Sequence, residues 1–160
     1  AILSNPPGLP QKGIGLLGVV DVPLEEADEV VSVASPKGIE FIPLAAPTSS
    51  PDRIRKISEK GAGFLYYVTV AGVTGARRAL PEGIAARLAE VRKASVLPVA
   101  AGFGISNPEM AHAAAESADA VVVGSKFVDL AYKTYVERGE AAALDAAADF
   151  VSSLAAQMKR

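Results

Sequence analysis

Residues 64–77 read Phe-Leu-Tyr-Tyr-Val-Thr-Val-Ala-Gly-Val-Thr-Gly-Ala-Arg, an apolar run rich in aromatic and β-branched side chains that ends in a turn with two glycines. Such a run is typical of a buried strand. The glycines are typical of a loop whose backbone comes close to a ligand or to another segment. A strand that ends in a glycine-bearing turn occurs again at residues 98–106 and 120–125. The recurrence predicts a series of strand–loop–helix units.

The remaining segments extend the same pattern along the chain. We expect strands at residues 16–20, 39–45, 64–70, 98–101 and 120–123, and helices at residues 24–33, 51–60, 81–93, 108–117, 125–138 and 140–158. Ser50-Pro51-Asp52 and Asn107-Pro108-Glu109 each combine an N-cap residue, a proline at the first helical position and an acid in the first turn. Apolar strands that alternate with amphipathic helices indicate an α/β protein with a parallel sheet covered by helices.

The number of units limits the architecture. A complete eight-unit (β/α)₈ barrel takes about 250 residues, whereas this chain has 160 residues and five predicted units. We therefore predict a partial barrel of the TIM type over residues 14–160, preceded by an irregular lead-in at residues 1–13. The pattern leaves open whether the sheet closes.

Composition excludes several classes of function. The 16 basic and 18 acidic residues nearly cancel and form no long run of one sign, which argues against nucleic acid as a partner. The chain contains no cysteine and one histidine, so we predict neither disulfides nor a metal site. No apolar stretch reaches the roughly 18 residues of a membrane span. We expect a protein of the cytoplasm that does not bind a membrane.

The loops that follow the strands carry the unusual residues. In a parallel sheet these loops share the edge at the C-terminal ends of the strands. Glycines at residues 72–77, 102–106 and 124–125 expose backbone N–H groups there, and a helix that begins at Ser125 would direct its positive dipole end to the same edge. The pattern predicts a phosphate ligand, with simple tight turns as the alternative for each glycine. The spacing fits neither a P-loop nor a dinucleotide fingerprint.

Few other side chains suggest chemistry. Asp21 ends a predicted strand and could act as a base or a ligand acceptor, although an aspartate before a helix is more often an N-cap. Tyr66 and Tyr67 are neighbours on one strand and should point to opposite faces of the sheet. His112 lies in the middle of an alanine-rich helix, where we expect a surface or packing role.

Six segments together resemble the alpha subunit of tryptophan synthase. They are residues 19–26, 46–48, 63–68, 72–77, 98–106 and 121–125. The resemblance implies a (β/α)₈ barrel of which this chain holds strands four to eight. It also implies a lyase activity that splits indole-3-glycerol phosphate into indole and glyceraldehyde 3-phosphate in tryptophan biosynthesis.

The resemblance assigns roles to single positions. It implies that the substrate phosphate is held by Gly75, Gly104, Gly124 and Ser125. It places Tyr66 and Phe103 around the indole and glycerol parts, and makes Thr74 the threonine of a lid loop that orders a catalytic aspartate. Lys126 and Phe127 stand where smaller residues are common in the family.

One part of the family pattern has no counterpart here. The catalytic glutamate and aspartate of the family lie in the first half of the barrel, and Asp21 is a weak substitute for them. The chain is therefore expected to be a lyase that is truncated or completed by another segment. The alternative is a non-catalytic half-barrel that binds a phosphate ligand and associates with itself through open edges. A third, weaker possibility is another phosphate-binding barrel enzyme.

The resemblance also implies a partner and a location. The expected partner is the beta subunit, which carries pyridoxal phosphate in this family, while the present chain is expected to bind no cofactor. The location would be the cytoplasm, or the plastid stroma for a plant protein.

Overall fold

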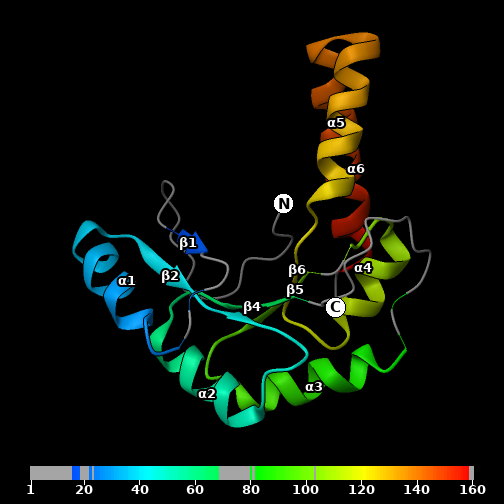
Figure 1. Ribbon diagram of the computed structural model, residues 1–160. Helices are drawn as coiled ribbons and strands as arrows, with labels where there is room; N and C mark the ends of the chain where they lie inside the picture. The colour runs from blue at the N-terminus through cyan, green and yellow to red at the C-terminus, as the bar shows by residue number, and fades with distance from the viewer. Residues whose placement is uncertain are drawn as a thin grey trace.

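The computed structural model describes residues 16–18, 22, 24–68, 80, 82–102 and 104–158 (Figure 1). The predicted lead-in at residues 1–13 lies outside these ranges. In chain order the elements are β1 (Leu16–Gly18), α1 (Ala27–Ala34), the 3₁₀ helix η1 (Ser35–Lys37), β2 (Glu40–Ile42), β3 (Leu44–Ala45), α2 (Pro51–Lys60), β4 (Leu65–Val68), α3 (Ile84–Ala94), β5 (Val99–Gly102), α4 (Pro108–Ala115), β6 (Ala120–Val121), α5 (Ser125–Arg138) and α6 (Glu140–Gln157).

All pairings between the described strands are parallel, in the orders β1-β2 and β3-β4-β5-β6. The sequence predicted one strand at residues 39–45, but the structure divides it into β2 and β3 at Pro43. Proline has no N–H to donate, so the ladder is interrupted there. The Pro43 carbonyl still accepts a hydrogen bond from the Tyr66 amide at 2.8 Å, so the chain leaves β1 and joins β4 without a turn. The result is a partial barrel of about five βα units.

The two faces of the sheet bury different sets of side chains. Leu65 and Tyr67 are fully buried against α2 and α3, where they pack with Ile54 and Leu88. Tyr66 projects from the other face, as its place in the alternation predicted. Figure 1 shows α2 and α3 along one side of the sheet. Each fully buried Leu or Ile there contributes roughly 1.5–3 kcal/mol to the stability of the fold. The helical layer thus covers one face of the sheet, and Tyr66 lies on the other face.

Two predicted helix starts are confirmed by their caps. The Ser50 hydroxyl accepts from the Arg53 amide at 3.2 Å, and the Asn107 side chain accepts from the Met110 amide at 2.8 Å. The start of α3 differs from the prediction of residue 81, because Gly83 has a left-handed φ of 77° and the helix begins after it. Similarly, α1 begins at Ala27 rather than at residue 24.

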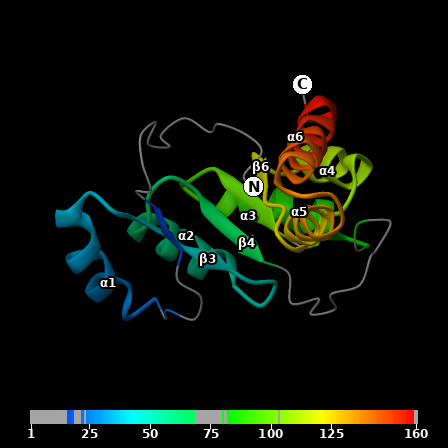
Figure 2. The same ribbon diagram turned by 90° about the horizontal axis from the view of Figure 1, so that it is seen from above.

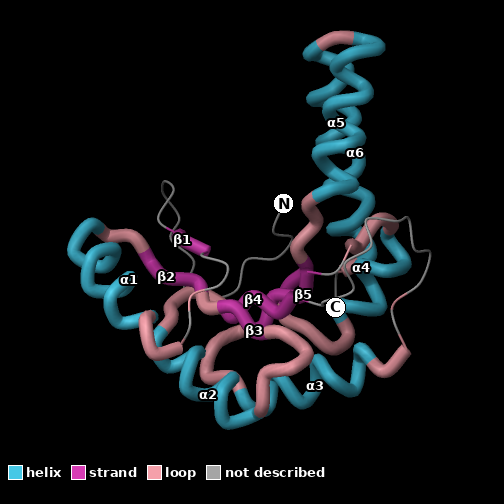
Figure 3. The backbone as a smooth tube through the Cα atoms, in the orientation of Figure 1, coloured by secondary structure: helices cyan, strands magenta, loops and turns pink. Residues whose placement is uncertain are grey.

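The last two helices form a hairpin that extends away from the sheet. Their bounds match the predicted ranges closely, and the turn between them is Gly139, with a φ of 85°. Figures 1, 2 and 3 all show α5 and α6 side by side. The lower part of α6 packs on α4 through Leu154, and His112 Nδ1 lies 2.8 Å from the Gln157 carbonyl oxygen. His112 is exposed and has the surface role that the sequence indicated.

No helix in the described part of the chain combines the length and the apolar character needed to cross a membrane.

Replacing Asn107 with alanine is expected to lower the free energy of unfolding by about 1 kcal/mol, because the Met110 amide loses its acceptor. Urea denaturation followed by circular dichroism measures this effect. Asn107→Asp keeps an acceptor oxygen and should leave the midpoint nearly unchanged. Equal midpoints for wild type and Asn107→Ala would show that the cap contributes nothing.

Candidate functional site

The C-terminal ends of β3, β4, β5 and β6 lie along one edge of the sheet, because every pairing among them is parallel. Among the described residues, Tyr66, Gly104, Gly124 and Ser125 belong to the predicted site. Tyr66 lies opposite Ala100 in the register of β4 and β5. The other predicted positions, Asp21, Thr74, Gly75 and Phe103, lie outside the described residues.

The Tyr66 side chain lies directly on the backbone of Gly102. A Cβ atom built on Gly102 would stand 2.6 Å from the Tyr66 ring carbon Cζ and would also overlap the hydroxyl. Only glycine admits the ring at this distance. The sequence placed Gly102 in a turn and did not reveal this contact. The contact could have been inferred from the parallel register of β4 and β5, in which Val68 lies opposite Gly102.

The surroundings of Tyr66 are apolar. Its ring packs in a cluster with Ile42, Phe64, Ala100 and Ala120. Partial burial raises the pKa of the Tyr66 phenol above its usual value of 10.0. The phenol is therefore neutral near pH 7, where it offers a flat apolar surface and one uncharged hydroxyl. This combination suits an aromatic ligand that carries a polar group.

Two glycines follow the neighbouring strands β5 and β6. Gly104 has a left-handed φ of 71°, and Gly124 directly precedes α5 with a φ of −107°. A Cβ atom on either residue would meet no atom of the described residues within 4 Å. Packing therefore does not require glycine at position 124, whereas a ligand that approaches the backbone would.

The start of α5 lies next to these glycines. Its first helical hydrogen bond runs from the Val128 amide to the Gly124 carbonyl at 3.1 Å, so the amides of residues 125–127 have no acceptor within the helix. Ser125 is exposed at this end. Amides without an acceptor in the helix and the positive end of the helix dipole together favour an anion.

The large side chain that departs from the family pattern does not crowd this edge. Phe127 packs in the cluster of Ile105, Met110 and Leu154 between α4 and α6. Lys126 is exposed to solvent. The Phe127 side chain is therefore accommodated in the apolar cluster between α4 and α6.

Carboxylates are scarce at the edge. Residues 46–50, 103–107 and 122–124, which follow β3, β5 and β6, contain no Asp or Glu. Glu40 has a buried, unpartnered oxygen, but it begins β2 and so lies at the opposite end of the sheet. Within the described ranges, no group of three or more His, Cys, Asp and Glu side chains could hold a metal ion.

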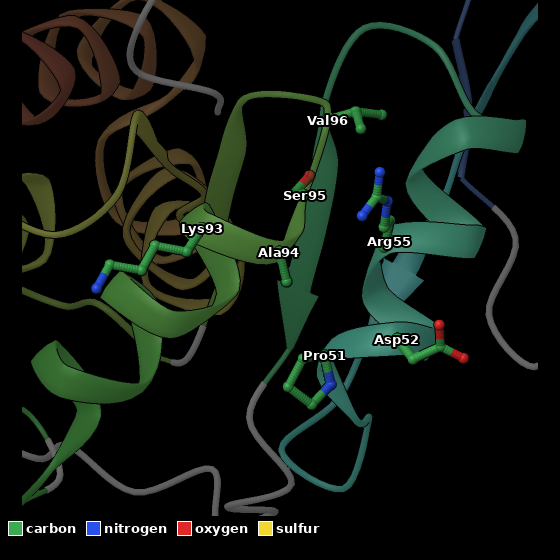
Figure 4. Close-up of a pocket in the computed structure, with 7 residues that line it drawn as sticks. All are labelled: Pro51, Asp52, Arg55, Lys93, Ala94, Ser95 and Val96. Atoms are coloured by element: carbon green, nitrogen blue, oxygen red, sulfur yellow. The ribbon is translucent and has the colours of Figure 1, made fainter.

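A hollow lies in the helical layer. It is an open groove of about 440 Å³ between α2 and α3 (Figure 4), and its lining residues are Pro51, Asp52, Arg55, Lys93, Ala94, Ser95 and Val96. Asp52 is already paired with Lys56 at 2.8 Å. The groove contains none of the predicted site residues and lies on the face of the sheet opposite to Tyr66.

Comparison with known proteins agrees with this geometry. Residues 9–159 match the family model described as "Tryptophan synthase alpha chain". The chain belongs to the tryptophan synthase alpha chain family. It is 46% identical over 145 residues to the tryptophan synthase alpha chain of Geobacter sp. (strain M21), covering 90% of this chain and 52% of that relative. The corresponding protein of Phenylobacterium zucineum is 48% identical over 117 residues, which are 73% of this chain and 42% of the relative.

Solved structures of the tryptophan synthase alpha family show the same fold. The alpha chain of Legionella pneumophila superposes with a TM-score of 0.77 at 35% identity, covering 91% of this chain and 52% of that chain. A structure of the a2b2 complex from Pyrococcus furiosus gives a TM-score of 0.70 at 33% identity, covering 87% and 54%. The present chain thus spans about half the length of the relatives that it matches. The phosphate and indole roles of its single residues stay predictions.

Replacing Gly102 with alanine is expected to cost about 1–3 kcal/mol of stability, because the new methyl group would displace the Tyr66 ring. Urea denaturation measures the loss. Gly124→Ala is the control for added volume, since its Cβ meets no atom of the described residues within 4 Å, and it should cost less stability than Gly102→Ala.

A double-mutant cycle assigns the cost to the contact itself. In a Tyr66→Ala background, Gly102→Ala should cost much less than in the wild type. The same cost in both backgrounds would show that Tyr66 and Gly102 are not in contact.

Proposed function

We propose that this chain is the phosphate-binding and indole-binding half of an indole-3-glycerol-phosphate lyase. The observation that carries the proposal is the Tyr66 ring seated on Gly102, at the same sheet edge as Gly104 and the start of α5. An aromatic wall beside free backbone amides is complementary to a ligand with an aromatic ring at one end and a phosphate at the other. Membership of the tryptophan synthase alpha family supports the same substrate.

The proposed roles follow from the chemistry of each group. Backbone N–H groups at Gly104, Gly124 and Ser125, together with Gly75, would hold the phosphate oxygens. Tyr66 and Phe103 would hold the indole and glycerol parts, and Thr74 would belong to a lid over them. Tyr66 enters as a neutral phenol because burial raises its pKa, so it places no negative charge beside the phosphate ester.

The reaction needs two further groups. Cleavage of the bond between indole C3 and the glycerol chain requires a proton for the indole ring and a base for the glycerol hydroxyl that becomes the aldehyde. The segments that follow β3, β5 and β6 contain no carboxylate to serve. Asp21 is the weak candidate in this chain, and we propose that the catalytic acid and base come from the other half of the barrel.

The scarcity of carboxylates favours a second candidate. The chain by itself would then be a phosphate-ligand-binding half-barrel without turnover. Its exposed strand edges would favour pairing with a second copy. Binding and catalysis therefore have to be measured separately.

A partner follows from the family. One related structure is described as an a2b2 complex of tryptophan synthase. We propose that a completed form of the present protein associates with a beta subunit in the cytoplasm, and that pyridoxal phosphate is bound by that subunit rather than by this chain.

Calorimetry with glycerol 3-phosphate and an indole-release assay with indole-3-glycerol phosphate test the two candidates. If the chain is half of a lyase, we expect it to bind glycerol 3-phosphate, and to release indole only when a segment that supplies the missing strands is added. Binding of glycerol 3-phosphate without indole release, with or without the added segment, would support the non-catalytic half-barrel. Absence of binding would reject both.

Gly124→Val is expected to weaken glycerol 3-phosphate binding at least about tenfold while the fold is retained, because the added side chain occupies the open space in front of the backbone amides. Ala141→Val, at an exposed position of α6, is the control for adding a β-branched side chain. Unchanged affinity in Gly124→Val would place the phosphate elsewhere.

A further inference from the structure

Arg87 connects α3 to the loop between β3 and α2. Its Nη2 atom donates to the Ser49 carbonyl at 2.6 Å and to the Pro47 carbonyl at 3.2 Å, while its Nη1 atom donates to Glu90 Oε2 at 2.9 Å. The side chain is only 24% exposed. These bonds link parts of the chain that are 38 and 40 residues apart, and neither the sequence patterns nor the family resemblance singled out Arg87.

The loop itself is built to present those carbonyls. The Ser49 amide donates to the Ala46 carbonyl at 2.9 Å, and the Ala46 amide donates to the Ser49 hydroxyl at 3.1 Å. Ser50 caps α2 through its own hydroxyl. The loop therefore pairs the amides of Ala46 and Ser49 locally and directs the carbonyls of Pro47 and Ser49 to α3. A guanidinium group carries several donors in one plane and can hold both carbonyls at once.

The charge of Arg87 is secured by its neighbours. The hydrogen bond to Glu90 raises the pKa of Arg87, and the nearby Tyr67 hydroxyl raises it further. Tyr67 is fully buried, and within the described residues neither its hydroxyl nor Arg87 Nε has a partner at hydrogen-bond distance and angle. These two unpartnered polar atoms lie in the same layer, between the strand pair β3–β4 and α3. Like any arginine, Arg87 is cationic, so a positive charge stands at the base of the loop.

The position of the loop matters for the site. It follows β3 directly, and β3 pairs with β4 so that Leu44 lies opposite Tyr66 and Ala45 opposite Tyr67. A shift of residues 46–49 would therefore first move Ala45, opposite Tyr67, and with it Leu44, the next residue of β3, which lies opposite Tyr66. Gly104 and Gly124 follow β5 and β6, which lie on the other side of β4 from β3.

We propose that Arg87 is a positioning residue that holds the 46–50 loop and, through it, the aromatic wall at Tyr66. It acts through the loop and the end of β3 and does not touch the ligand. The ligand side of this inference rests on the proposed function, whereas the hold on the loop does not. Arg87 is accordingly expected to affect recognition of the indole end and not of the phosphate end.

Amide hydrogen exchange tests the hold on the loop. In Arg87→Ala, the amides of Ala46 and Ser49 should exchange about tenfold faster or more, because two carbonyls lose a charged donor. Arg87→Lys keeps one charged donor and should restore part of the protection. Arg55→Ala is the matched control, because Arg55 forms only an exposed pair with Glu59 on α2, and it should leave both amides unchanged.

Binding of two probes tests the effect on the site. Indole-3-propanol phosphate, which cannot be cleaved, should bind at least about threefold more weakly to Arg87→Ala, while glycerol 3-phosphate should bind as to the wild type. A purely structural role would weaken both probes equally or neither.

The outcomes separate the two proposals. Wild-type exchange rates at Ala46 and Ser49 in Arg87→Ala would overturn the hold on the loop. If Arg87→Ala does not fold, Arg87→Lys is measured in its place. Wild-type exchange rates at Ala46 and Ser49 in Arg87→Lys, together with an equal loss of affinity for both probes, overturn the inference. If the wild type binds neither probe, the proposed function is rejected, and so is the predicted effect of Arg87 on ligand binding. Hydrogen exchange still decides whether Arg87 holds the loop.

Discussion

The parallel register of β4 and β5 is the constraint on which the site depends. It sets Val68 opposite Gly102 and Tyr66 opposite Ala100, so the Tyr66 ring lies on a backbone that only glycine can provide. The same alternation sends Tyr67 into the helical layer, where it is buried between the sheet and α3. Tyr67 thus packs against the helices, and its neighbour Tyr66 forms the aromatic surface on the other face of the same strand.

Local chemistry explains why most of the fold could be predicted from the sequence. Ser50 and Asn107 determine helix starts with their own side chains, and Gly139 ends α5, so each signal lies within a few residues of its effect. The break at Pro43 was missed because the apolar run continues through it. Pro43 is a local signal for the break, and the change of pairing partner from β1 to β4 shows that the run belongs to two ladders.

The site could be predicted only in part, for a physical reason. Glycines and a helix start at the strand ends indicate an anion-binding edge, and Gly104 and Gly124 do lie there with open space before them. The contact of Tyr66 with Gly102 and the bonds of Arg87 to the 46–50 loop join residues far apart in the chain. Such pairs depend on sheet register and helix packing, which no local pattern encodes. That the family's acid and base come from the other half of the barrel stays an implication of the resemblance.

The central claim is that this chain contributes the ligand-holding side of a lyase, with phosphate at Gly104, Gly124 and Ser125 and an aromatic ring at Tyr66. The most direct test is a titration of the isotope-labelled chain with indole-3-glycerol phosphate, followed by amide and aromatic chemical shifts. The account predicts that the largest changes occur at Gly104, Gly124, Ser125 and the Tyr66 ring. Changes confined to the groove between α2 and α3, at Arg55 and Lys93, or no changes at all, would contradict it.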